Sequence, residues 1–217
     1  MEFKICGITR PEDIQVCENE NSAFIGFINV KRSKRFLDIE KIRKFVDSMK
    51  KNEEAVLVIE PESAEEVIDL VEKSGVKNVQ LHSLKAEDIA DLKEINVIRA
   101  IGIPEKIDAS KKEEIKSFAK VCKYLMFDSM IRGKSGGTGK QIPLEVAAEA
   151  AEIAKKSNKN IKLFLAGGIN AQRIKIEGNL IKDIFDYVDI NSGVEDSPGI
   201  KNRDKIVEFV ENCKVIK

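Results

Sequence analysis

The chain has 217 residues, a length at which one domain can bury a complete hydrophobic core without dividing. Lys and Arg total 37, as do Asp and Glu, so no net charge favours nucleic acid or an anionic membrane surface as a partner. Hydrophobic residues make up 42% of the chain, and no apolar run approaches the ~20 residues that span a bilayer. The first ten residues lack the apolar stretch of a secretory signal. We therefore expect a single domain over residues 1–217, located in the cytoplasm, whose partner is a small molecule and neither nucleic acid nor a membrane.

The four cysteines, Cys6, Cys17, Cys122 and Cys213, lie far apart in the sequence. They form no C-x-x-C pair, and a single histidine offers little toward a structural zinc site, so we expect no bound metal. In a reducing compartment each thiol is most simply a small buried hydrophobic side chain. That interpretation is kept for three of them, whereas Cys6 is considered below with the candidate site.

Short apolar runs rich in β-branched residues alternate with amphipathic stretches along the chain, a pattern typical of parallel strands joined through helices. Eight such units in this length match a closed barrel, whereas a doubly wound open sheet, the alternative, usually has five or six strands. We therefore predict the α/β class and a single (β/α)₈ TIM barrel. The predicted strands cover residues 3–8, 23–28, 55–59, 78–81, 97–102, 124–128, 161–166 and 187–190.

Proline marks the start of two predicted helices. Pro11 stands at a favoured first-turn position, and Pro61 is followed by acidic residues, which the positive end of a helix dipole favours. We expect the second helix to begin at Pro61. Ile68, Leu70 and Val71 follow with helical spacing and are predicted to face the core.

In a barrel the reactive groups stand just past the carboxyl ends of the strands, so those positions form the candidate site. Cys6 ends the first strand beside Gly7, where its thiol would face the barrel mouth; the alternative is a small core residue. The cationic loop over residues 30–35 provides arginines that bind carboxylate or phosphate, unless it is simply a solvated run of charge. His82 ends the fourth strand and is interpreted either as part of the site wall or as a packed polar residue.

Asp128 directly follows the apolar sixth strand, and a glycine-rich loop lies beyond it. Burial against an apolar wall would raise the pKa of its carboxyl group and suit it to donate a proton, whereas a turn or helix-cap aspartate is the alternative. The loop over residues 133–141 invites comparison with a nucleotide-binding P-loop. That pattern needs glycine in place of Lys134 and Ser or Thr in place of Gln141. We predict instead a flexible lid over the barrel mouth.

Glycines follow the last two predicted strands. Gly167 and Gly168 come after the seventh strand, and Ser192 with Gly193 comes after the eighth. Glycine lets backbone N–H groups approach an anion closely, and barrels often bind phosphate in these two loops. The sequence therefore predicts a phosphate site between them.

With these motifs at successive strand ends, the chain resembles the phosphoribosylanthranilate isomerase family of tryptophan biosynthesis over nearly its whole length. It departs from the family pattern at Ser83, where glycine is common, at residues 29–31, and at the end of the third strand, residues 59–61. The motifs are KICGIT at 4–9, SKR at 33–35, VQLH at 79–82, FDS at 127–129, GGTG at 136–139, AGGIN at 166–170, and residues 189–195 with 198–199.

The resemblance implies an isomerase that converts N-(5-phosphoribosyl)anthranilate to 1-(2-carboxyphenylamino)-1-deoxyribulose 5-phosphate. The reaction is an Amadori rearrangement that needs an acid and a base and no cofactor. We expect a monomer or a homodimer. The implied roles are Cys6 as general base, Asp128 as general acid, Arg35 for the anthranilate carboxylate, His82 and Asp189 for other substrate contacts, and backbone amides at Gly167, Gly168, Ser192 and Gly193 for the phosphate.

The residues alone are also compatible with two other functions. The chain could be another phosphosugar barrel, such as an epimerase or an isomerase of the histidine pathway, although such epimerases need metal ligands that one histidine does not supply. It could also be a non-catalytic barrel that binds phosphorylated metabolites. The observation that discriminates against this non-catalytic function is whether Cys6 and Asp128 face each other across a pocket.

Overall fold

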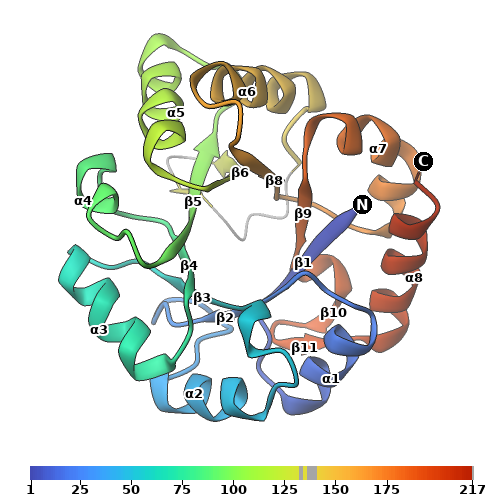
Figure 1. Ribbon diagram of the computed structural model, residues 1–217. Coiled ribbons are helices and arrows are strands. Elements are labelled where there is room, and N and C mark those ends of the chain that lie inside the picture. The colour runs from blue at the N-terminus through green and yellow to red at the C-terminus, as the bar shows by residue number, and fades with distance from the viewer. Residues whose placement is uncertain (132–133, 136–140, 217) are drawn as a thin grey trace.

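The structure is a computed structural model that describes residues 1–131, 134–135 and 141–216. Within these residues, eight parallel strands close on themselves because β6 pairs with β5 on one side and with β8 on the other. Figure 1 looks along this barrel, with the helices arranged around its outside. The predicted TIM barrel is confirmed. Its strands are β1 (Glu2–Cys6), β2 (Phe24–Ile28), β3 (Ala55–Ile59), β4 (Asn78–Leu81), β5 (Asn96–Ile103), β6 (Tyr124–Ile131), β8 (Lys162–Leu165) and β9 (Tyr187–Ile190).

Helices connect the strands and cover the outer face of the barrel (Figure 1). Among the described residues, no helix is both long and apolar enough to cross a membrane. The α-helices are α1 (Pro11–Asn19), α2 (Ile39–Ser48), α3 (Ala64–Ser74), α4 (Ala86–Ala90), α5 (Ala109–Val121), α6 (Leu144–Ser157), α7 (Ala171–Ile184) and α8 (Arg203–Lys214). Smaller elements are η1 (Asn52–Glu54), η2 (Ser192–Val194), β7 (Lys134–Ser135), β10 (Glu195–Ser197) and β11 (Ile200–Lys201).

The strands separate two hydrophobic cores, one between barrel and helices and a smaller one inside the barrel. Inside, four aromatic rings pack at the end where the strands begin, from Phe24, Tyr124, Phe164 and Tyr187. The rings of Phe164 and Tyr187 stack with centroids 4.4 Å apart. These rings fill that end of the barrel, and a pocket lies at the opposite end, where the strands finish.

The predicted strands match the structure closely. Three of them, at 55–59, 78–81 and 187–190, have the observed bounds. The first strand was predicted too long: it ends at Cys6 because Gly7 turns the chain with a φ of +73°. The sixth was predicted too short, because it continues to Ile131 and pairs there with β7. Most of the predicted lid over 133–141 lies outside the described residues, apart from Lys134–Ser135 and Gln141.

The start of α3 differs from the prediction. The helix begins at Ala64, three residues after Pro61, because the hydroxyl group of Ser63 accepts a hydrogen bond from the backbone N–H of Glu66 and caps the helix. The predicted core stripe was also wrong at one position, since Ile68 is 45% exposed and Val67 is the fully buried residue.

Candidate active site

The carboxyl ends of the barrel strands surround a pocket of about 430 Å³. Cys6 from β1 and Asp128 from β6 both line it, although 122 residues separate them in the sequence. Two strands, β8 and β9, lie between β1 and β6 on one side of the barrel, and four lie between them on the other. The pocket therefore places a thiol and a carboxyl group on different walls of one cavity. Of the other predicted site residues, Arg35, His82, Gly167, Gly168, Asp189 and Ser192 also line it, and Gly193 does not.

Cys6 is the last residue of β1, and its side chain points into the barrel, where it is 3% exposed. Burial is the largest influence on the thiol and raises its pKa above the ordinary value. The positive charges of Lys4 and Lys201 oppose that effect, whereas Asp189 adds to it. The thiol is therefore mainly protonated in the free protein at neutral pH, and nearby cations lower the cost of ionising it.

Asp128 lies in β6 with its side chain 9% exposed, and the backbone N–H of Ser129 donates a 2.7 Å hydrogen bond to its Oδ1. Burial raises the pKa of its carboxyl group to about 6, and repulsion from Asp189 contributes in the same direction. A carboxyl group with this pKa can hold and release a proton near neutral pH, as a general acid must.

Lys4 is a site residue that the sequence analysis did not identify. Its ammonium group is fully buried inside the barrel and donates a 2.6 Å hydrogen bond to Oδ1 of Asp189. Lys4 and Asp189 are direct partners in the pairing of β1 with β9, so their side chains stand side by side on the inner face. The only signal in the sequence was the alternation of Lys4 with Cys6 along one strand, which places both on the same face.

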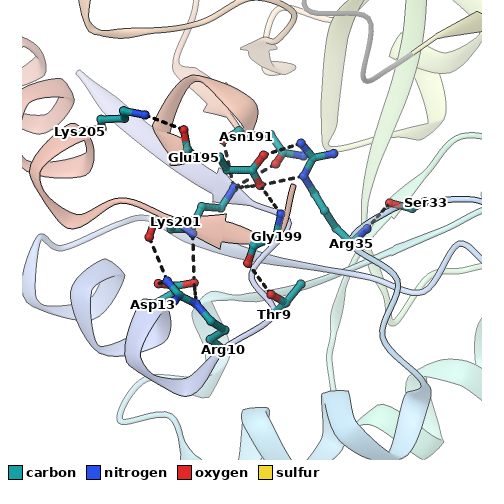
Figure 2. A network of polar contacts seen from close by, with 10 residues as sticks. All are labelled: Thr9, Arg10, Asp13, Ser33, Arg35, Asn191, Glu195, Gly199, Lys201 and Lys205. Atoms are coloured by element: carbon teal, nitrogen blue, oxygen red, sulfur yellow. Dashed lines mark hydrogen bonds and ion pairs between the residues drawn. The ribbon is translucent and has the colours of Figure 1, made fainter. Parts of the chain in front are cut away.

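Arg35 reaches the pocket from the loop after β2, where it meets a buried carboxylate. Its Nε and Nη2 donate hydrogen bonds of 2.8 and 2.5 Å to the two carboxylate oxygens of Glu195. Lys201 donates a hydrogen bond of 3.0 Å from its Nζ to Oε1 of the same carboxylate. Figure 2 draws this contact together with the Arg35 pair. The remaining guanidinium nitrogen, Nη1, has no partner within the described part of the chain. Glu195 therefore fixes Arg35 and leaves one edge of the guanidinium group for a ligand.

His82 stands on the pocket wall at the end of β4. Burial lowers the pKa of its imidazole to about 4, so the ring is neutral near pH 7. Its Nε2 lies 3.0 Å from the amide nitrogen of Gln80, a neighbour that also lines the pocket and was not predicted. At the mouth, Arg32 and Glu60 form an ion pair between the loops after β2 and β3. Glu60 lies within residues 59–61, one of the departures from the family pattern.

The two glycine loops provide backbone donors at one side of the pocket. Gly167 and Gly168 adopt φ angles of +79° and +65°, which an ordinary side chain would disfavour. Among the described residues, no acceptor pairs with the backbone N–H groups of Gly167, Gly168, Ser192 or Gly193. The start of α7 also lies here, capped by the side chain of Asn170. Unpaired N–H groups beside a helix N-terminus favour an anion.

The lack of a side chain at Gly193 lets the two glycine loops lie close together. A Cβ atom built on it would lie 2.2 Å from the carbonyl oxygen of Ile169, so any side chain would separate them. Arg173 of α7, which the sequence analysis did not single out, fixes the first loop from behind. Its Nη1 donates to the carbonyl oxygen of Gly167 at 3.1 Å, and its Nη2 donates to that of Ile142 at 2.9 Å.

Residues 3–212 match the sequence model of the family described as N-(5'-phosphoribosyl)anthranilate (PRA) isomerase. The chain belongs to this family. It is 34% identical over 212 residues to the N-(5'-phosphoribosyl)anthranilate isomerase of Methanothermobacter thermautotrophicus, an alignment covering 96% of this chain and 86% of that protein. The solved phosphoribosylanthranilate isomerase of Thermus thermophilus superposes with a TM-score of 0.80 at 25% identity, covering 99% and 98% of the two chains. The same TM-score, identity and coverage apply to generated monomers of the dimeric enzyme from Thermotoga maritima.

Among the described residues of this family member, no group of three or more His, Cys, Asp or Glu side chains could hold a metal ion. The chemistry available comes from a thiol, a carboxyl group of raised pKa and backbone donors at the pocket, with two buried ammonium groups, those of Lys4 and Lys201, behind its wall. Such a set can move protons on a phosphorylated ligand.

Proposed function

We propose that the chain isomerises N-(5-phosphoribosyl)anthranilate to 1-(2-carboxyphenylamino)-1-deoxyribulose 5-phosphate, the reaction of its family in tryptophan biosynthesis. The observation that carries the proposed mechanism is the placement of Cys6 and Asp128 in one pocket beside the two glycine loops. An Amadori rearrangement needs one group that gives a proton and another that takes one, both close to a sugar whose phosphate is held.

Asp128 is the general acid in the first half of the proposed reaction. Its carboxyl group protonates the ring oxygen of the ribose, the bond between that oxygen and C1 breaks, and the anilino nitrogen supplies the electrons that form an iminium at C1. The raised pKa supports this role, because an ordinary aspartate would rarely hold a proton at neutral pH.

Cys6 is the general base in the second half. Its thiolate takes the proton from C2, and the electron pair of that C–H bond forms a double bond between C1 and C2 as the iminium is neutralised. The resulting enolamine then tautomerises to the ketone. The charges of Lys4 and Lys201 support formation of the thiolate in a site where burial opposes it.

The remaining site residues would bind the substrate. In this proposal the backbone N–H groups of the two glycine loops hold the phosphate, as predicted for Gly167, Gly168, Ser192 and Gly193. Arg35 holds the anthranilate carboxylate through its free edge, since Glu195 already occupies the other. His82 is a neutral wall and hydrogen-bonding group, and Asp189 contacts a substrate hydroxyl.

The same proposal covers the remaining properties of the protein. All 217 residues would form one catalytic domain that works in the cytoplasm as a monomer or a homodimer. Its partner would be the phosphorylated small molecule, with no nucleic acid and no cofactor. The balanced charge and the continuous barrel support this assignment.

The decisive experiment follows the fluorescence of phosphoribosylanthranilate as purified protein consumes it. Cys6→Ala and Asp128→Ala should each lower kcat by at least about 100-fold while affinity for the product changes little, because both groups act mainly in the transition state. Cys122→Ala is the matched control, since this cysteine is also buried but lies outside the barrel interior. Near-normal turnover by Cys6→Ala would refute the mechanism, and no decay with the wild-type protein would refute the function.

A further inference from the structure

Lys4 does not line the pocket, yet it lies directly beneath Cys6, the residue proposed to take a proton from the substrate. Its side chain is fully buried, whereas Cys6, two residues further along β1, forms part of the pocket wall. A buried ammonium group is costly unless it is paired. Asp189 provides the pair at 2.6 Å, from the position on β9 that is in register with Lys4.

The neighbouring strand leaves room for the ammonium group to approach the sulfur. Gly26 of β2 is in register with Cys6, and a Cβ atom there would lie 2.8 Å from the Cys6 Sγ and 3.2 Å from the Lys4 Nζ. Sγ and Nζ thus border the same small space, which any side chain at position 26 would fill. The absence of a side chain lets the two groups interact across it.

The charges around the sulfur favour Lys4 as its main counterion. Although burial alone would lower the pKa of Lys4, attraction to Asp189 and Cys6 raises it, so the ammonium group keeps its proton. Among the groups that lower the pKa of the thiol, Lys4 has the largest effect and exceeds Lys201. The charged groups that act on the Cys6 thiol are Lys4 from β1, Asp189 from β9 and Lys201 from β11, and the thiol acts in turn on Arg35 from the loop after β2. The other charged or titratable groups that line its pocket are Arg32, Lys34, Glu60, His82 and Asp128.

We propose that Lys4 is a positioning residue for the reaction: held by Asp189, its ammonium group lies beside the Cys6 sulfur and balances the thiolate charge. This rests on the proposed function, in which Cys6 is the base. Lys4 itself touches no substrate atom. Its pairing with Asp189 fixes the ammonium group at a constant place below the sulfur, so that ionisation of Cys6 needs no rearrangement of the barrel interior.

The test measures the ionisation of Cys6 without substrate. The ultraviolet absorbance of the thiolate is followed against pH in each protein and in the same protein carrying Cys6→Ala, and the difference isolates one sulfur. Lys4→Met should raise the midpoint by about one to three pH units, the usual effect of losing an opposite charge at close range. Lys4→Arg, which keeps the charge, should lie nearer the wild type. Lys162→Met is the matched control, because Lys162 also pairs with an aspartate but stands at the other end of the barrel.

Steady-state kinetics give the second measurement. Lys4→Met should lower kcat at least about tenfold at neutral pH and change KM little, with the loss recovered as the pH rises toward the new midpoint. A merely structural role would alter neither the thiolate midpoint nor this pH dependence. A midpoint equal to that of the wild type in Lys4→Met would overturn the proposal.

A double variant covers the case in which Lys4→Met does not fold. Lys4→Met with Asp189→Asn removes both charges of the buried pair, and its midpoint is compared with that of Asp189→Asn alone. An upward shift supports the proposal, and equal midpoints contradict it. Because the absorbance needs no substrate, its outcome is separate from that of the proposed function, which fails if the wild-type protein does not consume phosphoribosylanthranilate.

Discussion

Replacing Asp128 with asparagine should abolish turnover and at the same time stabilise the folded protein at neutral pH. Asparagine has nearly the same shape and keeps an oxygen that can accept the hydrogen bond from the backbone N–H of Ser129, which is 2.7 Å long in the wild type. What it removes is the ability to ionise. Because the carboxyl group is buried, its ionised form is unfavourable in the folded protein, and the unfolded chain does not share that cost.

The size of the effect follows from the shift in pKa. Burial raises the pKa of the Asp128 carboxyl from 3.8 to about 6. Each unit corresponds to about 1.4 kcal/mol, so the ionised carboxylate costs the folded state up to about 3 kcal/mol. Since the folded pKa lies above the unfolded one, the cost is absent below the unfolded pKa, grows between 3.8 and about 6, and is constant above that range.

The assay is thermal or urea denaturation of both proteins at about pH 8 and about pH 4. At the higher pH, Asp128→Asn should raise the free energy of unfolding by about 3 kcal/mol, equivalent to roughly 6–12 °C in Tm for a domain of this size. At the lower pH the two proteins should differ little, because both side chains are then mostly neutral.

Asp186→Asn is a matched control with the opposite sign. Burial favours the neutral form of Asp186, but hydrogen bonds from Lys162 and the backbone of Leu163 outweigh it and lower the pKa of its carboxyl. Its ionised form is therefore stabilising above the unfolded pKa, and the variant should lose stability at about pH 8. Equal stability of Asp128→Asn and wild type at both pH values would refute the assignment of a buried, destabilising carboxylate.

Three further predictions concern the pocket. His82 is the one histidine of the chain, so its ring signals can be followed in an NMR titration. Because burial lowers its pKa to about 4, these signals should stay constant from about pH 8 to about pH 5. A titration midpoint near 6.5 would contradict burial of the ring. Glu195→Gln should reduce the free energy of unfolding by about 3 kcal/mol in urea denaturation, because it leaves the buried Lys201 and the partly buried Arg35 without their counterion; a loss below about 1 kcal/mol would argue against this. Gly193→Ala places a Cβ atom 2.2 Å from a carbonyl oxygen and should weaken binding of inorganic phosphate in calorimetry, whereas unchanged affinity would show that the loops tolerate separation.

Much of the fold could be predicted because each barrel strand has a local pattern. The run Ala55–Ile59 is buried at every position, and a continuous apolar run of this length predicts a central parallel strand with its bounds. The candidate positions at the strand ends followed from the same pattern. The start and the buried face of helix α3 were predicted less accurately. Pro61 and Ser63 are both favourable near a helix start, and the apolar residues after them are compatible with more than one buried face.

The sequence by itself determined the alternation of strands and helices, the position of Cys6 at the end of its strand, and the glycines that follow the last two barrel strands. Asp128 was expected just past the sixth strand and lies inside it, because β6 continues to Ile131. Only the tertiary structure decided which charges meet. Lys4 and Asp189 are 185 residues apart, and Arg35 and Glu195 are 160 apart, so no local period connects them. Their contacts exist because closure of the barrel places β1 beside β9, and the raised pKa of Asp128 likewise depends on the burial that this closure produces and on the nearby charge of Asp189. Periodicity reports which face of a segment is buried, whereas pairing between distant segments and the pKa values within a pocket depend on how the segments pack.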